Sequence, residues 1–207
     1  AVVLNNGQIG AVTFLGTVSP AGGNLKEPVT ESTKKAARCF YALNQNRADK
    51  KRYPAVDPID SYSKYLDYPE IVQYMSEHIA PDWVEKVLKA KNIVLRGKEA
   101  YEQINILGDD GVPIAYHEIY WKSELIDFVI LQQDAFDKID SSCPMERQEY
   151  MLSLVLEACD AQKEFDTFEE CSTYYKGLIN IFKQMNYSEF KSAEFDKYLS
   201  QIKNTIS

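Results

Sequence analysis

Tyr53 and Phe136 are the residues of this sequence whose types and settings are best suited to binding chemistry. Tyr53 precedes Pro54, which restricts the backbone before it and favours a stiff, extended loop. Phe136 follows the polar pair of Leu131-Gln132-Gln133. Two aromatic rings held on opposite sides of a cleft can stack on a flat heterocycle. Considered alone, each ring is explained as well or better as part of the core or as a half-buried loop residue.

The segments before Tyr53 predict a strand, a loop and a helix. Residues 11–15 are a β-branched and aromatic run between two glycines, which predicts a buried strand. Pro20, Gly22 and Gly23 then favour a loop. Thr30 is a candidate N-cap, and apolar residues follow at helical spacing as far as Leu43. This order is typical of the last part of an α/β nucleotide-binding domain.

From about residue 61 the pattern is helical, so the fold class is mainly α. Apolar residues from Val84 to Ile104 form one face of a long helix that ends near Gly108. A loop is expected at 109–113, followed by a buried helix over 119–131. Further helices are predicted after Pro144, after a capping box formed by Asp166 and Glu169, and over 195–206.

Composition excludes several functional classes. The net charge of -8 and the pI of about 4.9 argue against a surface for nucleic acid or anionic membrane. No apolar stretch approaches the roughly 20 residues that span a bilayer, so no membrane insertion is expected.

The cysteines and histidines do not have the spacing of a metal site. The four cysteines lack C-x-x-C spacing, and free thiols in a reducing cytosol are expected. His78 and His117 do not have metal-ligand spacing from any cysteine, so solvent-facing or capping roles are favoured over zinc. Cys143 lies just before a predicted helix start, where its pKa could be lowered, although an inert thiol is the favoured interpretation.

Several motifs occur together in a characteristic order. These are S-P-A-G-G-N at 19–24, E-P-V-T at 27–30, Y-P-A at 53–55 and L-Q-Q at 131–133, followed by Phe136. With these separations the chain resembles, over nearly its whole length, the C-terminal part of the catalytic A subunit of V/A-type rotary ATPases, the family of V-type ATP synthase alpha chains. Asp134 departs from the family pattern, in which Asn is commoner.

The resemblance implies roles for specific residues. Tyr53 and Phe136 would form the two sides of the adenine pocket. Gly22 and Gly23 would face the rotor. Asp109 and Asp110 would also face it, although their acidic run is much shorter than the one at the corresponding place in related rotary ATPases. Ordinary turns also explain these four residues. The expected organisation is the C-terminal remnant of a RecA-like α/β nucleotide-binding domain at 1–60 and a helical C-terminal domain at 61–207.

The resemblance also implies cofactors and partners. The parent subunit would bind ATP or ADP with Mg²⁺, contact B subunits of a catalytic hexamer and central-stalk subunits, and couple catalysis to ion transport. It would lie in the cytoplasm as a peripheral part of a membrane-bound complex.

The sequence contains no G-x-x-x-x-G-K-[ST] motif, because Gly97-Lys98 is followed by Glu99 and lacks the earlier glycine. We therefore expect a C-terminal fragment with no ATPase activity and no bound nucleotide. The alternative is a free-standing acidic helical scaffold, which an upstream reading frame encoding the missing motif would exclude.

Overall fold

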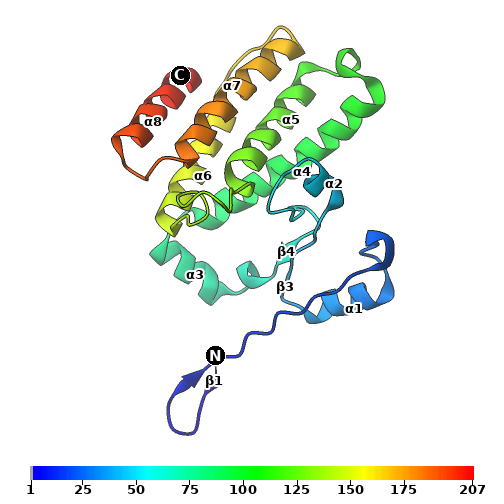
Figure 1. The fold of residues 1–207 in the computed structure, drawn as a ribbon, viewed down its shortest axis with the longest axis vertical. Helices are drawn as coiled ribbons and strands as arrows, with labels where there is room; N and C mark the ends of the chain where they lie inside the picture. The colour runs from blue at the N-terminus through cyan, green and yellow to red at the C-terminus, as the bar shows by residue number, and fades with distance from the viewer. Residues whose placement is uncertain (1) are drawn as a thin grey trace. The chain divides into compact units, whose positions relative to one another are not determined.

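The computed structural model describes residues 2–207 as two compact units, one ending at Arg38 and one spanning Cys39–Ser207. The first unit contains a two-stranded antiparallel hairpin in which Val2 pairs with Gly10 and Val3 with Ile9. Its elements are β1 (Val2–Val3), β2 (Ile9–Gly10), the 3-10 turn η1 (Ala21–Gly23) and α1 (Pro28–Ala36) (Figure 1).

The predicted strand at 11–15 is wrong. Residues 11–15 have no regular secondary structure, and Val12, Phe14 and Leu15 are 98%, 91% and 85% exposed. A strand is stable only when its backbone groups pair with a neighbour. Within residues 2–207, the strand pairs form elsewhere, between β1 and β2 and between Cys39–Phe40 and Tyr62–Ser63.

The helix that follows begins earlier and ends sooner than its pattern suggests. Glu27, not Thr30, is the N-cap of α1, and its side chain accepts hydrogen bonds from the backbone amides of Val29 and Thr30. The helix ends at Ala36. Phe40 lies in a strand and Leu43 in an isolated β-bridge with Val56, so their helical spacing is coincidental.

The second unit is a helical bundle with a small β-ladder at its start, so the mainly α fold class is confirmed. In the ladder, Cys39 pairs with Ser63 and Phe40 with Tyr62. The elements are β3 (Cys39–Phe40), α2 (Gln45–Asp49), β4 (Tyr62–Ser63), η2 (Tyr65–Asp67), α3 (Pro69–His78), α4 (Trp83–Leu107), η3 (Asp109–Gly111), α5 (Ile114–Ile126), η4 (Asp127–Leu131), α6 (Met145–Asp160), α7 (Phe168–Asn186) and α8 (Ala193–Ile206) (Figure 1).

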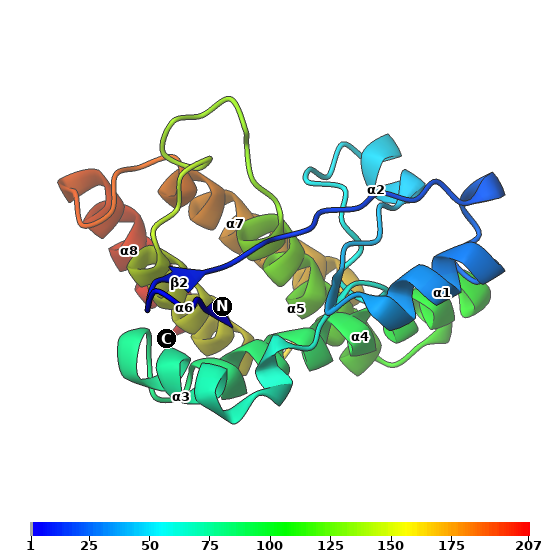
Figure 2. The same cartoon turned by 90° about the horizontal axis from the view of Figure 1, so that it is seen from below.

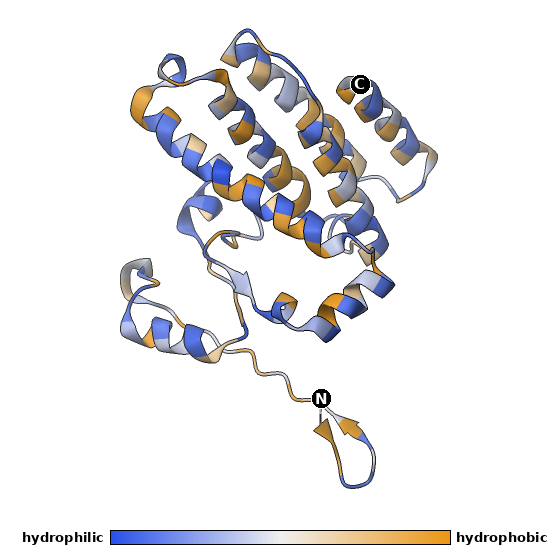
Figure 3. Ribbon diagram, turned by 180° about the vertical axis from the view of Figure 1, so that it is seen from behind, coloured by the Kyte–Doolittle hydropathy of each residue, from blue (hydrophilic) through white to orange (hydrophobic). Residues whose placement is uncertain are grey.

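The helices pack through their apolar faces in a chain of neighbours. The helix α4 packs along α5, α5 packs on α7, and α7 packs on α8 (Figure 2). Along each helix hydrophobic and hydrophilic residues alternate, as amphipathic packing requires (Figure 3). The fully buried centre comes from α5, α6, α7 and α8 and includes Leu125, Val155, Cys171, Leu178, Phe182, Met185 and Ile202.

The helix ends agree with most sequence expectations. Gly108 terminates α4 with φ 80°, a backbone conformation that glycine adopts without a Cβ penalty. The helix α6 begins directly after Pro144, as predicted, although Pro144 is its N-cap and not a residue of its first turn. The capping box of α7 is displaced by one residue, because Thr167 rather than Asp166 accepts the hydrogen bond from the amide of Glu170. No helix within residues 2–207 has the length and apolar character needed to cross a membrane.

Candidate functional site

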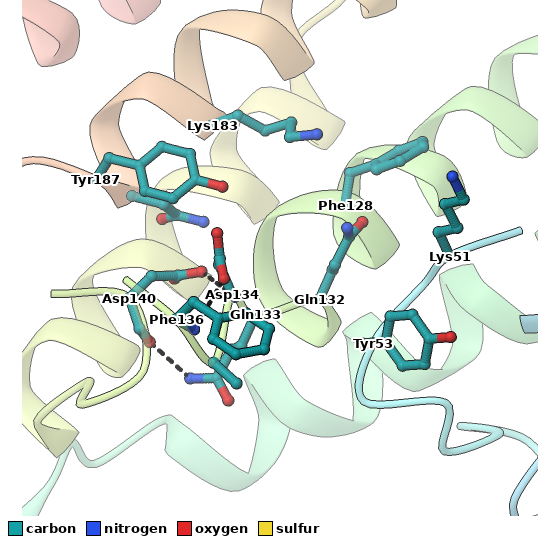
Figure 4. A pocket seen from close by; sticks show the side chains of 12 residues that line it. Lys51, Tyr53, Phe128, Gln132, Gln133, Asp134, Phe136, Asp140, Lys183 and Tyr187 are labelled. Atoms are coloured by element: carbon teal, nitrogen blue, oxygen red, sulfur yellow. Dashed lines mark hydrogen bonds between the residues drawn. The ribbon is translucent and has the colours of Figure 1, made fainter. Parts of the chain in front are cut away.

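Tyr53 and Phe136 line the same cavity, which has a volume of about 470 Å³. Tyr53 comes from the loop after α2, and Phe136 comes from the loop after η4. Figure 4 shows Tyr53, Phe128 and Lys51 on one side and Phe136 with Tyr187 on the other, with Gln132 between Tyr53 and Phe136. All of these residues belong to the second unit.

The loop that carries Tyr53 is held by hydrogen bonds in which backbone carbonyls are the acceptors. The amide of Arg52 donates to the carbonyl of Arg47 at 2.8 Å, and the Tyr53 hydroxyl donates to the carbonyl of Ala48 at 3.4 Å. The Tyr53–Pro54 peptide is cis. The amide of Gln133 donates to the carbonyl of Tyr53 at 2.9 Å. This last bond joins the two loops directly, so the two walls of the cavity have a fixed common point.

The loop that carries Phe136 is organised by aspartates. The Asp140 carboxylate accepts from the amide of Asp134 at 2.6 Å, and Asp134 in turn accepts from the amide of Phe136 at 2.9 Å. Burial raises the pKa of Asp140, because it outweighs that amide hydrogen bond and the nearby charge of Arg147. The Phe136 ring itself is 98% exposed. An apolar ring presented to solvent on an ordered loop is available to stack on a ligand.

The floor of the cavity is built on the π-helical turn η4. Such turns inside helices occur frequently at functional sites. The carbonyl of Val129 in this turn accepts a hydrogen bond from the Asn186 side chain at 2.9 Å. The Phe128 ring has two cations near it, with the Arg52 guanidinium 4.4 Å and the Lys183 ammonium 5.3 Å from its centroid. Lys51 also lines the cavity, so cations accompany the aromatic walls.

A cluster of four largely buried charges joins the loop that carries Tyr53 to the end of α5, and sequence reasoning missed it. Arg47 and Arg52 pair with Glu124 and Asp127. Burial by itself would lower the pKa of Arg52, but the two carboxylates raise it above its ordinary value. The available signal was Asp127 in an otherwise apolar segment, since a charged residue is seldom buried without a partner.

The remaining predicted site residues are not among those that line this cavity. Gly22 and Gly23 belong to η1 of the first unit and have φ values of 63° and 70°. Asp109 and Asp110 are exposed residues of η3 in the second unit. Their assignment as rotor-facing stays a prediction.

The structure agrees with the favoured interpretation of Cys143 as an inert thiol, and it corrects the solvent-facing assignment of His117. Burial raises the pKa of Cys143, although Arg147 opposes it, so no thiolate is favoured at the start of α6. His117 is buried rather than solvent-facing, with its ring stacked on Phe168 and its Nε2 3.0 Å from the carbonyl of Asp109. Among residues 2–207, no group of three or more His, Cys, Asp or Glu side chains is placed to hold a metal ion.

Two family profiles match consecutive parts of the chain. Residues 2–63 match the nucleotide-binding domain of the ATP synthase alpha/beta family. Residues 72–175 match the C-terminal domain of V and A type ATP synthase. The cavity uses both regions, because Tyr53 lies in the first match and Phe136 in the second.

Curated relatives match almost the entire chain. V-type ATP synthase alpha chains are 37% identical over 205 residues in Protochlamydia amoebophila, 40% over 202 in Chlamydia abortus and 36% over 205 in Borrelia duttonii. These alignments cover 98–99% of this chain but only 33–34% of each relative, so the chain spans about a third of their length. A solved ATP synthase subunit from Nanoarcheaum equitans matches 68% of this chain and 33% of its own at 18% identity and a TM-score of 0.49.

The profiles and the relatives agree in order and coverage, and the matched portion of the alpha chains is their C-terminal part. The chain therefore belongs to the V/A-type ATP synthase family.

Proposed function

We propose that this chain supplies the base-binding cleft and the nucleotide-responsive helical domain of a catalytic subunit in a rotary V/A-type ATPase. One observation carries the proposal: Tyr53 and Phe136, from loops far apart in sequence, line one cavity. The bond from the Gln133 amide to the Tyr53 carbonyl supports it, because it holds the two loops together.

The chemistry of the cleft suits an adenine ring. Exposed aromatic rings offer stacking faces, and the side-chain amides of Gln132 and Gln133 at the wall offer hydrogen bonds to ring nitrogens. Stacking contributes about 1–3 kcal/mol per base, which without phosphate contacts corresponds to a dissociation constant of about 6 mM or weaker. The phosphates of a bound nucleotide would need contacts from outside this cleft.

The parent subunit, we propose, binds ATP or ADP with Mg²⁺ between A and B subunits and couples catalysis to shaft rotation and ion transport. Phosphoryl transfer requires a phosphate-binding loop, Mg²⁺ and an arginine finger. Residues 1–207 contain no phosphate-binding loop motif, so this chain alone should not hydrolyse ATP. In the same proposal the subunit lies on the cytoplasmic side as a peripheral part of a membrane complex.

Two structural assignments belong to this proposal. Residues 1–60 belong to the nucleotide-binding domain, and 61–207 form the helical C-terminal domain. The loops that contain Gly22 and Gly23, and Asp109 and Asp110, face the central stalk. Motion of the helical domain with nucleotide state would then reach the rotor through the exposed Asp109–Asp110 loop rather than through the core.

The test is a nucleotide titration followed residue by residue with ¹H–¹⁵N NMR. Adding ATP at millimolar concentration should shift the amides of Gln133 and Tyr187, and Phe136→Ala should abolish the shifts. Phe14→Ala is the matched control, because Phe14 is 91% exposed and lies in the other unit. Unchanged shifts in Phe136→Ala would refute the cleft. Phosphate release by the isolated chain above background would refute its catalytic inactivity.

A further inference from the structure

We propose that Arg52 is a positioning residue for the base-binding cleft, locking the Tyr53 loop to the start of the π-helical turn η4. The proposal rests on the proposed function for its purpose, but its geometry does not depend on a nucleotide. Neither the family profiles nor the resemblance assigns a role to Arg52.

The contact is a two-pronged ion pair. The two terminal nitrogens of Arg52 bond to the two carboxylate oxygens of Glu124, Nη1 to Oε1 at 3.0 Å and Nη2 to Oε2 at 2.6 Å. The Nη1 atom also bonds to Asp127 Oδ2. Bidentate pairs of this kind fix orientation as well as distance. Arg52 is therefore held in one geometry relative to the end of α5.

A second arginine completes the charge balance. Arg47 Nη1 lies 2.7 Å from Asp127 Oδ1, which gives two cations and two carboxylates in one cluster. The four side chains are only 9–16% exposed. A buried charge is tolerated only when it is paired, so neither Arg52 nor Asp127 can leave without stranding its partners.

The cluster connects to both walls of the cleft. Arg52 is the residue immediately before Tyr53, and Asp127 is the first residue of η4, which leads to Gln133. The Arg52 guanidinium also lies over the Phe128 ring, which lines the cavity. The lock and the Gln133–Tyr53 backbone bond thus constrain the same loop from two sides. Loosening the Arg52 ion pairs should therefore let the Gln133–Tyr53 backbone bond open and expose the Gln133 amide to solvent.

A purely stabilising ion pair would behave differently. It would lower the stability of the entire bundle, and all protected amides would exchange faster together. A positioning residue instead controls local opening, which hydrogen exchange resolves separately from global unfolding. The amide of Gln133 is the local reporter, and the amide of Leu178, at the buried centre of α7, is the global reporter.

The experiment compares amide exchange rates by ¹H–¹⁵N NMR in Arg52→Gln, Arg52→Lys and Lys86→Gln. Lys86 is the matched control, because it forms a partly buried pair with Glu149 at 2.7 Å on another part of the bundle. In Arg52→Gln, exchange at Gln133 should accelerate by about tenfold or more relative to Leu178, since hydrogen bonds to charged groups are worth roughly a factor of ten each. Arg52→Lys should give an intermediate acceleration, because lysine keeps the charge but not the two-pronged geometry.

Equal acceleration at both amides, or the same effect in Lys86→Gln, would overturn the proposal. If Arg52→Gln fails to fold, Arg52→Lys decides the question by the same ratio. No nucleotide is present in this measurement. Its failure is therefore distinct from a failure of the ATP titration, which tests base binding alone.

Discussion

Replacing Gly97 by alanine should destabilise the helical bundle, although alanine is the better helix former. Gly97 lies inside α4 and packs closely against Ser123 and Ile119 of α5. An added Cβ would lie 2.1 Å from the Cβ of Ser123 and 3.2 Å from the carbonyl oxygen of Ile119. Both obstacles are fixed by the backbone, so no side-chain rotation can relieve them. The two helices would have to move apart.

The magnitude follows from two opposing contributions. Carbon atoms in contact lie about 3.5–4.0 Å apart, so the gap between the two Cβ atoms must widen by roughly 1.5 Å. Overpacking of a core typically costs about 1–3 kcal/mol. The Gly to Ala change returns up to about 1 kcal/mol of helix propensity. Because the overlap is severe and rigid, we expect a net loss of about 1–2 kcal/mol in the free energy of unfolding.

Urea unfolding followed by tryptophan fluorescence is a suitable assay, because Trp83 lies in α4 and Trp121 in α5. The midpoint should fall while the slope with urea stays unchanged. Gly177→Ala in α7 is the matched control, since an added Cβ there would meet nothing within 4 Å. The control should gain about 0.5–1 kcal/mol from propensity alone.

The decisive comparison is a compensating double change. Ser123→Gly removes the obstructing Cβ. In a Ser123→Gly background, adding Gly97→Ala should therefore lower the free energy of unfolding much less than it does in the unmodified protein. If Gly97→Ala raised the midpoint as Gly177→Ala does, or if the double variant recovered nothing, the close approach of α4 and α5 would be refuted.

Three further outcomes follow from the second unit. Phe136→Ala should leave the unfolding midpoint unchanged, because the ring is 98% exposed, while weakening nucleotide binding in the parent subunit by about 1–3 kcal/mol in a titration. Asp57→Ala should cost about 1–3 kcal/mol at pH 7. Burial by itself would raise the pKa of Asp57, but hydrogen bonds from the amides of Asp60 and Ile59 outweigh it and lower the pKa below its ordinary value of 3.8. The loss of stability in Asp57→Ala is therefore complete above pH 3.8, and it should shrink in urea curves measured at lower pH. Cys159 and Cys171 are buried, and burial raises the pKa of both thiols to about 12, so iodoacetamide followed by mass spectrometry should label them only after unfolding. The partly exposed Cys39 and Cys143 are accessible to the reagent and should react in the native state, Cys143 more slowly because burial raises its pKa as well; labelling of Cys171 without unfolding would contradict this.

The helical part of the fold could be predicted because its signals are local. The apolar face of α4 and its end at Gly108, the start of α6 at Pro144 and the buried segment before Gln132 all depend on spacing and capping within one turn or a few turns of helix. The pairing of Tyr53 with Phe136 came from the family resemblance. Periodicity by itself favoured the core for Phe136, and the structure places that ring almost entirely in solvent.

The strand at 11–15 shows the limit of the same reasoning. A run of β-branched and aromatic residues indicates that a segment suits a sheet, but it does not supply the sheet. Val12 and Phe14 have no neighbouring strand within residues 2–207 and stay exposed. Phe40 shows the opposite case. Its spacing from Ala36 suits a helix, but Phe40 forms a strand because Tyr62 is available as a pairing partner.

The charge cluster could not be assembled from the sequence, although one of its members was visible. Asp127 stands in the most apolar segment of the chain, and burial there required a cation. With 23 lysines and arginines to choose from, spacing alone gives no reason to prefer Arg52. The choice depends on the loop after α2 reaching the end of α5, a contact between residues 75 positions apart. Arg52, which pairs with Asp127, is also the residue before Tyr53. The ion pair that neutralises the buried Asp127 carboxylate therefore also positions the Tyr53 ring.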